Sequence, residues 1–114
     1  MMLSKGEKLF VITRRQFEGD LRRHFVGEVQ GTTEWAVRVQ GYLFVYDNVN
    51  NVYVRREGER TRIFSLVDAG LVINLLPREA VLKDVRYRAD EEDHLVLTDE
   101  KSFKLDINEF GFYR

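Results

Sequence analysis

Cysteine is absent from this chain of 114 residues, and proline occurs once, at Pro77. Without cysteine there are neither disulfides nor thiolate metal ligands, and only His24 and His94 offer imidazole nitrogens. No serine or cysteine nucleophile stands in a recognisable motif near His24. The common motifs for phosphate loops, dinucleotides, zinc hydrolysis and acyl transfer are also missing. We therefore expect a protein that is not an enzyme and that holds no metal or cofactor.

Long apolar runs and an excess charge of one sign are also lacking. No apolar stretch approaches the roughly 20 residues that span a bilayer, and the first eight residues lack the apolar core of a secretory signal. Eighteen basic and 19 acidic side chains give a net charge of -1, which argues against a dedicated, tight DNA coat. We expect a cytoplasmic protein that does not associate with membranes.

The chain is rich in residues that form β-strands. Eight Phe, five Tyr and one Trp supply large apolar area, since each buried ring removes roughly 150–250 Å² from water. The length suits one domain with one core. Apolar residues recur with a period of two between clusters of turn residues. The pattern predicts an all-β fold of eight or nine short strands.

Several strands can be placed by this alternation. Residues 25–30 and 35–39 flank a turn at 31–34 and predict a hairpin. Gly41, inside a long strand from about 35 to 46, permits the bulge or sharp bend that closes a small barrel. The other expected strands are 52–55 with 61–66 (a second hairpin), 71–76 (covered on both faces), 81–87, and 95–97 with 103–107 (a C-terminal hairpin).

Residues 8–13 are also expected to form a strand, and the segment between this strand and the strand at 25–30 allows two interpretations. Phe17, Leu21 and Phe25 at a spacing of four are compatible with a short N-terminal helix. Gly19 and Asp20 favour a turn between two strands instead. Both interpretations stay open at this point.

Arginines concentrate in the same segment and could clamp phosphates while an aromatic ring stacks on a base. Glu18 and Asp20 lie among them, so an ion-pair network or a subunit contact is the alternative. The single tryptophan, which begins a strand, either packs at the rim of the core or serves as a stacking platform. The candidate nucleic-acid-binding residues are Arg14, Arg15, Arg22, Arg23 and Trp35.

Two further charged segments predict solvated surface. The basic residues Arg55, Arg56, Arg60 and Arg62 alternate with Glu57 and Glu59, as in an ordinary charged hairpin tip. An acidic run at residues 90–93 precedes His94, but neighbouring loop carboxylates point to water and repel one another. We therefore expect no metal site there.

The order of segments from Phe25 to Leu76 resembles that of the Sm-like proteins, which are small bent five-stranded barrels that form rings and usually bind RNA. Residues 25–31 resemble the strand of the family's first motif with its glycine. Residues 66–73 resemble the turn and last strand of the second motif. The resemblance implies a small barrel, a ring-shaped assembly and an RNA ligand. It covers less than half of the chain, and residues after Pro77 are an addition to the basic barrel.

The residues of the family's uridine pocket are not matched. Thr33 stands where an acidic residue is expected, Ala36 or Val37 where the base-contacting Asn should be, and Val67 where the second motif has Arg. Trp35 lies near the position of the family's base-stacking side chain. The resemblance therefore carries over Trp35 alone as a contact residue.

These observations predict one domain of residues 1–114, with a small SH3-like or Sm-like barrel over about 8–76 and a C-terminal β extension over about 77–114. Exposed sheet edges invite strand pairing, so we expect a homo-oligomer. Two functions remain open. The protein is either a nucleic-acid-binding oligomer that takes RNA or single-stranded DNA, or a protein-interaction or structural module that binds neither.

Overall fold

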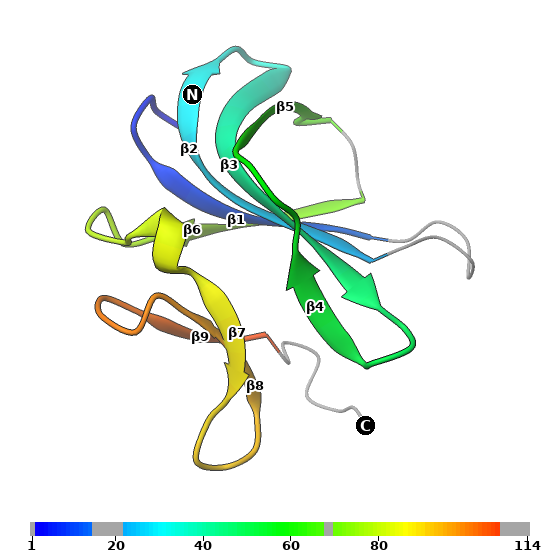
Figure 1. Cartoon of the computed structure of the whole chain (residues 1–114). Coiled ribbons are helices and arrows are strands. Elements are labelled where there is room, and N and C mark those ends of the chain that lie inside the picture. The colour runs from blue at the N-terminus through cyan, green and yellow to red at the C-terminus, as the bar shows by residue number, and fades with distance from the viewer. Residues whose placement is uncertain (1, 15–21, 68–69, 108–114) are drawn as a thin grey trace.

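The computed structural model describes residues 2–14, 22–67 and 70–107. These residues form two antiparallel sheets with one short 3₁₀-helix and no α-helix (Figure 1), so the expected all-β class is confirmed. No helix in this part of the chain is long and apolar enough to cross a bilayer. The elements are β1 (Lys8–Thr13), β2 (Arg23–Thr32), β3 (Ala36–Asp47), β4 (Val52–Arg55), β5 (Arg60–Ser65), β6 (Leu71–Leu76), η1 (Leu82–Asp84), β7 (Arg86–Ala89), β8 (Leu95–Thr98) and β9 (Lys104–Asp106).

The larger sheet has the order β4-β3-β2-β1-β6, and β5 also pairs with β3. The predicted hairpin of β2 and β3 is confirmed, with a bulge between Val29 and Gly31. The predicted hairpin of 52–55 with 61–66 is wrong. Among the described pairings, β4 pairs with the last residues of β3 and β5 with the first ones. Both β4 and β5 are therefore hydrogen-bonded to the long strand β3. The charged turn between them interrupts what is otherwise one strand that runs antiparallel to β3.

A close contact between two glycines bends the larger sheet. Gly27 and Gly41 lie opposite each other in β2 and β3. A Cβ on Gly41 would lie 1.9 Å from the carbonyl oxygen of Val26, and a Cβ on Gly27 would lie 2.5 Å from a side-chain carbon of Val39. Only residues without a side chain allow this approach. The bend expected at Gly41 therefore depends on a pair of glycines.

The concave side of the bent sheet encloses a first core. Its buried residues come from β1, β2 and β3, and partly buried residues of β5 and β6 pack against them. Strands β5 and β6 lie at opposite ends of the sheet, and both contact this cluster, so the sheet curls around it (Figure 1). The buried members are Leu9, Val11, Phe25, Val29, Val37, Val39 and Leu43.

The opposite face of the same strands contributes to a second core, which the C-terminal segment completes. Phe10, Val26 and Phe44 project from this face, as the alternation of side chains along a strand requires. They pack with residues from the segment after Pro77, including Val85 and Leu97. The smaller sheet, of order β7-β8-β9, therefore covers the convex face of the larger sheet.

Asp99 holds the turn between β8 and β9 and ties it to the chain before η1. Its side chain is 1% exposed and accepts hydrogen bonds from the backbone N–H groups of Val81, Lys101 and Ser102 at 2.7–2.9 Å. Burial alone would raise the pKa of Asp99, but these hydrogen bonds hold it well below its usual value. These three N–H groups lie outside the strands, and the ionised carboxylate accepts the hydrogen bonds that water would otherwise accept.

Three details of the prediction are corrected. The barrel expected over residues 8–76 is not closed, because the described pairings leave the two ends of the sheet unjoined. The strand expected over 71–76 is β6, but it is not covered on both faces, because Leu75 is 61% exposed. β6 is also an edge of the sheet, with β1 as its described partner. The strand expected over 81–87 begins at Arg86, after η1. The proposed N-terminal helix falls largely on residues 15–21, which lie outside the described residues.

Substitution of Gly41 by Ala should destabilise the protein by about 3 kcal/mol or more, because the new Cβ meets backbone atoms that cannot move aside alone. Gly31→Ala is the matched control, since a Cβ there lies 4.0 Å from its nearest neighbour. Urea denaturation of both variants tests this. Equal stability of the two variants would show that the sheet does not depend on the glycine contact.

Candidate functional site

The structure brings some of the predicted arginines together and separates them from the tryptophan. Arg14 follows β1 directly, and Arg22 and Arg23 stand at the start of β2, which pairs with the end of β1. Trp35 is 66% exposed and lies in the turn at the other end of β2. Arg15 lies outside the described residues. Trp35 and the arginines therefore do not form one site within a protein monomer.

Arg22 leads to an aromatic cluster on the convex face of the larger sheet. Its guanidinium carbon lies 5.2 Å from the ring centroid of Tyr46, within the range of a cation–π interaction. Tyr46 contacts Tyr53 edge-on, with centroids 5.0 Å apart. The two tyrosines are cross-strand partners in β3 and β4, which places both rings on one face.

Tyr53 covers a histidine and a tyrosine that join the two sheets. Its ring stacks on His24 at 4.4 Å and on Tyr87 at 4.7 Å between centroids. The His24 and Tyr87 centroids are only 5.8 Å apart, too close to lie on opposite faces of Tyr53. The Nδ1 atom of His24 and the hydroxyl of Tyr87 are hydrogen-bonded. A polar link between β2 and β7 thus lies inside the aromatic cluster.

Burial keeps His24 neutral. The imidazole is 6% exposed, and its desolvation, followed by the positive charge of Arg22, lowers the pKa of His24 from 6.5 to about 4. Burial, followed by the charge of Tyr53, raises the pKa of the Tyr87 hydroxyl well above its usual value. Both groups are therefore uncharged near neutral pH, and the pair serves as a structural link.

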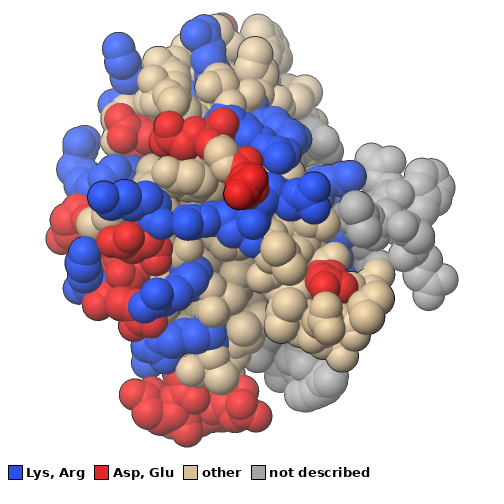
Figure 2. Space-filling view, viewed as in Figure 1, with Lys and Arg blue, Asp and Glu red and all other residues tan. Residues whose placement is uncertain are grey.

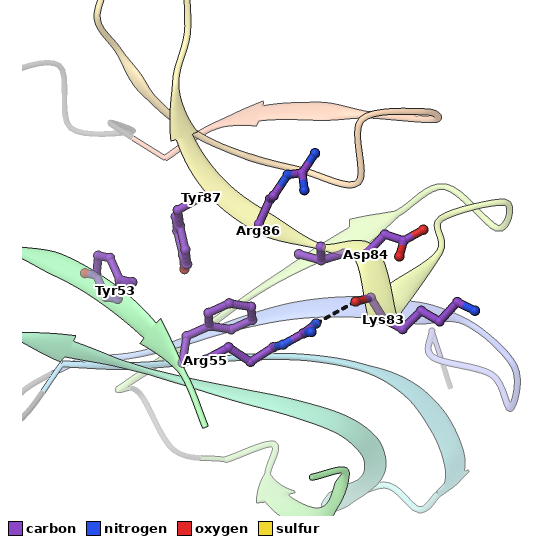
Figure 3. A pocket seen from close by; sticks show the side chains of 8 residues that line it. Tyr53, Arg55, Lys83, Asp84, Arg86 and Tyr87 are labelled. Carbon is purple, nitrogen blue, oxygen red and sulfur yellow. Dashed lines mark hydrogen bonds between the residues drawn. The ribbon is translucent and has the colours of Figure 1, made fainter. Parts of the chain in front are cut away.

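A cleft of about 400 Å³ opens beside this cluster, between β4 on one side and η1 with β7 on the other. Tyr53, Tyr87 and the buried Phe44 form its aromatic wall (Figure 3). Arg55 crosses the cleft, with its guanidinium 4.9 Å from the centroid of Tyr42. Its Nη1 donates a hydrogen bond of 2.6 Å to the carbonyl oxygen of Lys83. The remaining lining residues are Lys83, Asp84, Val85 and Arg86.

The charges around the cleft leave it positive. Neither Arg55 nor Lys83 forms an ion pair within the described part of the chain, and the Lys83 side chain extends from the rim (Figure 3). Asp84 is paired with Lys101 at 3.1 Å. Arg86 lies 3.4 Å from Glu100, which it shares with Arg88. Figure 2 shows basic side chains running across the middle of this face. The cleft can therefore hold an anion beside an aromatic wall.

Sequence reasoning missed most of this site. Tyr53 stands in no motif, and the sequence predicts Arg55 in an ordinary charged hairpin tip. Lys83, Arg86 and Tyr87 carry no motif, and they come to Arg55 from a segment about 30 residues further along the chain. The one usable signal was the alternation of Tyr53 and Arg55 in a strand, which predicts a shared face.

The acidic loop after β7 brings potential metal ligands together, but these side chains form hydrogen bonds and ion pairs with the loop and with β9. Ligand atoms of Asp90, Glu92 and His94 lie within 4.8 Å of one another. The Asp90 carboxylate accepts hydrogen bonds from the backbone N–H groups of Glu92 and His94, and His94 lies 3.3 Å from Asp106. Glu92 and His94 are exposed. The arrangement is accounted for by the turn that these residues form.

Comparison of the chain with family models, with curated proteins and with solved structures finds no match.

The free energy of unfolding should fall by roughly 3 kcal/mol as the pH drops from 6.5 to 4, because the unfolded chain binds a proton on His24 that the folded chain excludes. The stabilisation is complete above pH 6.5 and is lost as the pH approaches 4. Urea denaturation at a series of pH values measures it. In His24→Phe, which keeps an aromatic ring but cannot titrate, most of this slope should disappear.

His94→Gln is the matched control, because His94 is exposed and, within the described part of the chain, its ion-pair partners are the carboxylates of Glu92 in the loop and Asp106 in β9. This variant should keep the pH dependence of the wild type. If His24→Phe kept it as well, the buried histidine would not be its source.

Proposed function

We propose that this protein is a binding module for single-stranded nucleic acid and that the cleft between β4 and β7 is its contact site. The observation that carries the proposal is the juxtaposition of Arg55 and Lys83, which have no ion-pair partner among the described residues, with the aromatic wall of Tyr53 and Tyr87. Proteins that bind single strands combine cations for the phosphates with aromatic surfaces for the bases.

Two further features support the proposal. Arg22 and Tyr46 extend the basic and aromatic surface from the cleft along the hairpin of β3 and β4. The Sm-like resemblance of residues 25–76 implies a small bent β fold with an RNA ligand, and the larger sheet is antiparallel and bent at the glycine pair. On this proposal the contact surface differs from that family's uridine pocket, whose residues this chain does not match.

Substitution of Lys83 by Ala should weaken binding of a single-stranded oligonucleotide about threefold to tenfold and lower the salt slope by about 0.7, the value for one phosphate contact on a single strand. The Lys83 side chain makes no hydrogen bond or ion pair in the described structure, so the variant should fold normally. Fluorescence anisotropy over a range of salt concentrations measures both quantities, and thermal melting checks the fold.

Arg62→Ala is the control, because Arg62 is an exposed cation on β5 that does not line the cleft. It should leave affinity and salt slope close to those of the wild type. If Trp35→Ala weakened binding and Lys83→Ala did not, the contact site would lie at the turn between β2 and β3 and not in the cleft. Absence of binding to RNA and DNA at about 50 mM salt, where phosphate contacts are strongest, would leave a protein-interaction module as the function.

Self-association through the sheet edges is a second candidate property. Strands β5 and β6 have one described partner each, and they carry the exposed residues Ile63 (70%) and Leu75 (61%). An unpaired edge with exposed apolar side chains favours strand addition. A second copy of the chain could pair its β6 with β5 of the first and so continue the sheet into a dimer or ring.

Light scattering should therefore give a mass of at least twice the monomer for the wild type. Leu75→Lys places a charge at the proposed contact and should return the monomer mass. Val49→Lys, which adds the same charge at an 88% exposed position in the turn between β3 and β4, should not. A monomeric wild type over the accessible concentration range would contradict the assembly.

A further inference from the structure

The size of the cleft limits what it can hold. Its volume of about 400 Å³ lies near the lower end of the range of roughly 300–1,000 Å³ for small-ligand sites. Grooves that follow a single strand contact about 4–16 nucleotides per domain. The cleft therefore suits one nucleotide unit, and the rest of a bound strand must leave it.

The cations favour a doubly charged group in this position. Arg55 uses Nη1 for the carbonyl oxygen of Lys83, which leaves other guanidinium N–H groups able to bind two oxygens of one phosphate. Lys83 extends from the rim and adds a second charge (Figure 3). Arg86 points away from Arg55 in the same view and lies 3.4 Å from Glu100. An internal phosphodiester carries one negative charge, whereas a phosphomonoester approaches two at neutral pH. The buried Phe44 and the tyrosine wall border the cations on one side, where apolar surroundings strengthen the attraction relative to open water.

The surface beyond β7 repels a continuing strand. β7 leads from Arg86 at the cleft to the loop with Asp90, Glu91, Glu92 and Asp93, about 13 Å away at the rise of an extended strand. Acidic side chains fill the lower end of the same face in Figure 2, where Figure 1 places the β7–β8 loop. A polyanion that ran past the cleft in this direction would meet four carboxylates. The Tyr46 and Arg22 side offers a basic path instead.

From size, charge and the acidic flank together we infer that the cleft takes a nucleotide unit that carries a phosphomonoester, either a free mononucleotide or the phosphorylated end of a single strand. This inference rests on the proposed function and names the group that the cleft selects. A strand end places its terminal phosphate on Arg55 and Lys83 and its body along the surface of Tyr46 and Arg22.

The test compares single-stranded DNA oligomers of one sequence that carry a 5′-phosphate, a 3′-phosphate or hydroxyls at both ends. Fluorescence anisotropy at about pH 7.5 should show that at least one phosphorylated end binds about tenfold tighter than the hydroxyl form. The preference should shrink at about pH 5.5, where the monoester keeps one charge because its second pKa is about 6. A nucleoside monophosphate should compete with the labelled oligomer more strongly than the nucleoside does.

Three variants separate the parts of the site. Lys83→Ala should reduce the preference for a phosphorylated end to less than about threefold, and Arg62→Ala should keep it. Arg22→Ala should weaken binding of every oligomer by a similar factor but leave the affinity for the monophosphate unchanged, because Arg22 contacts Tyr46 and does not line the cleft.

Equal affinity for phosphorylated and hydroxyl oligomers would overturn the inference while the proposed nucleic-acid binding stood. A preference that survived Lys83→Ala unchanged would also overturn it, because the selected phosphate would then lie elsewhere. If no oligomer bound but the monophosphate still competed for a labelled mononucleotide, the cleft would keep its phosphomonoester selectivity and the proposed function would fail.

Discussion

The contact of Gly27 with Gly41 is the constraint on which the rest of the structure depends. At this point the backbones of β2 and β3 approach so closely that a Cβ on either glycine would meet atoms of the opposite strand. The approach allows two long strands to bend, and the bend brings the ends of the sheet, β5 and β6, around one apolar cluster. A flat sheet of the same strands would leave that cluster open on one side.

The bend also determines what happens on the convex face. Strands β1, β2 and β3 are apolar on both faces, and the curled sheet encloses one face only. Phe10, Val26 and Phe44 would remain in water without the segment after Pro77, which covers them. The cover includes one polar link, between His24 and Tyr87, and both groups remain uncharged near neutral pH. A neutral pair avoids the cost of a buried charge at this junction.

The candidate site is a consequence of incomplete cover. The smaller sheet reaches the aromatic face from one side, and β4 bounds it from the other, so a cleft remains between Arg55 and β7. Basic side chains line this border, whereas carboxylates gather in the loop at the far end of β7. A chain with a net charge of -1 can thus present a local positive surface, because Asp84 and Glu100 are already paired with cations of the smaller sheet.

Much of the secondary structure follows from the sequence alone. The period of two in residues 25–30, in residues 35–39 and in the C-terminal hairpin determined the all-β class, because one buried face requires alternating apolar residues. The glycine at position 41 indicated the bend, since a strand interior tolerates a missing side chain only for a close approach or a bulge. These features are local, and local sequence carries them.

The partners of each face were decided by the tertiary structure. The turn between β4 and β5 reads as a hairpin turn, yet both strands lie along β3, because a bent strand of 12 residues offers more hydrogen bonds than the short hairpin would. Tyr53 and Arg55 share a face by alternation, but only packing places Lys83 and Tyr87 opposite them. Alternation in a sequence determines which side chains point the same way. What covers them depends on contacts between segments far apart in the chain. Here those contacts place β4, which the sequence predicts as part of a charged hairpin, along one side of a cleft.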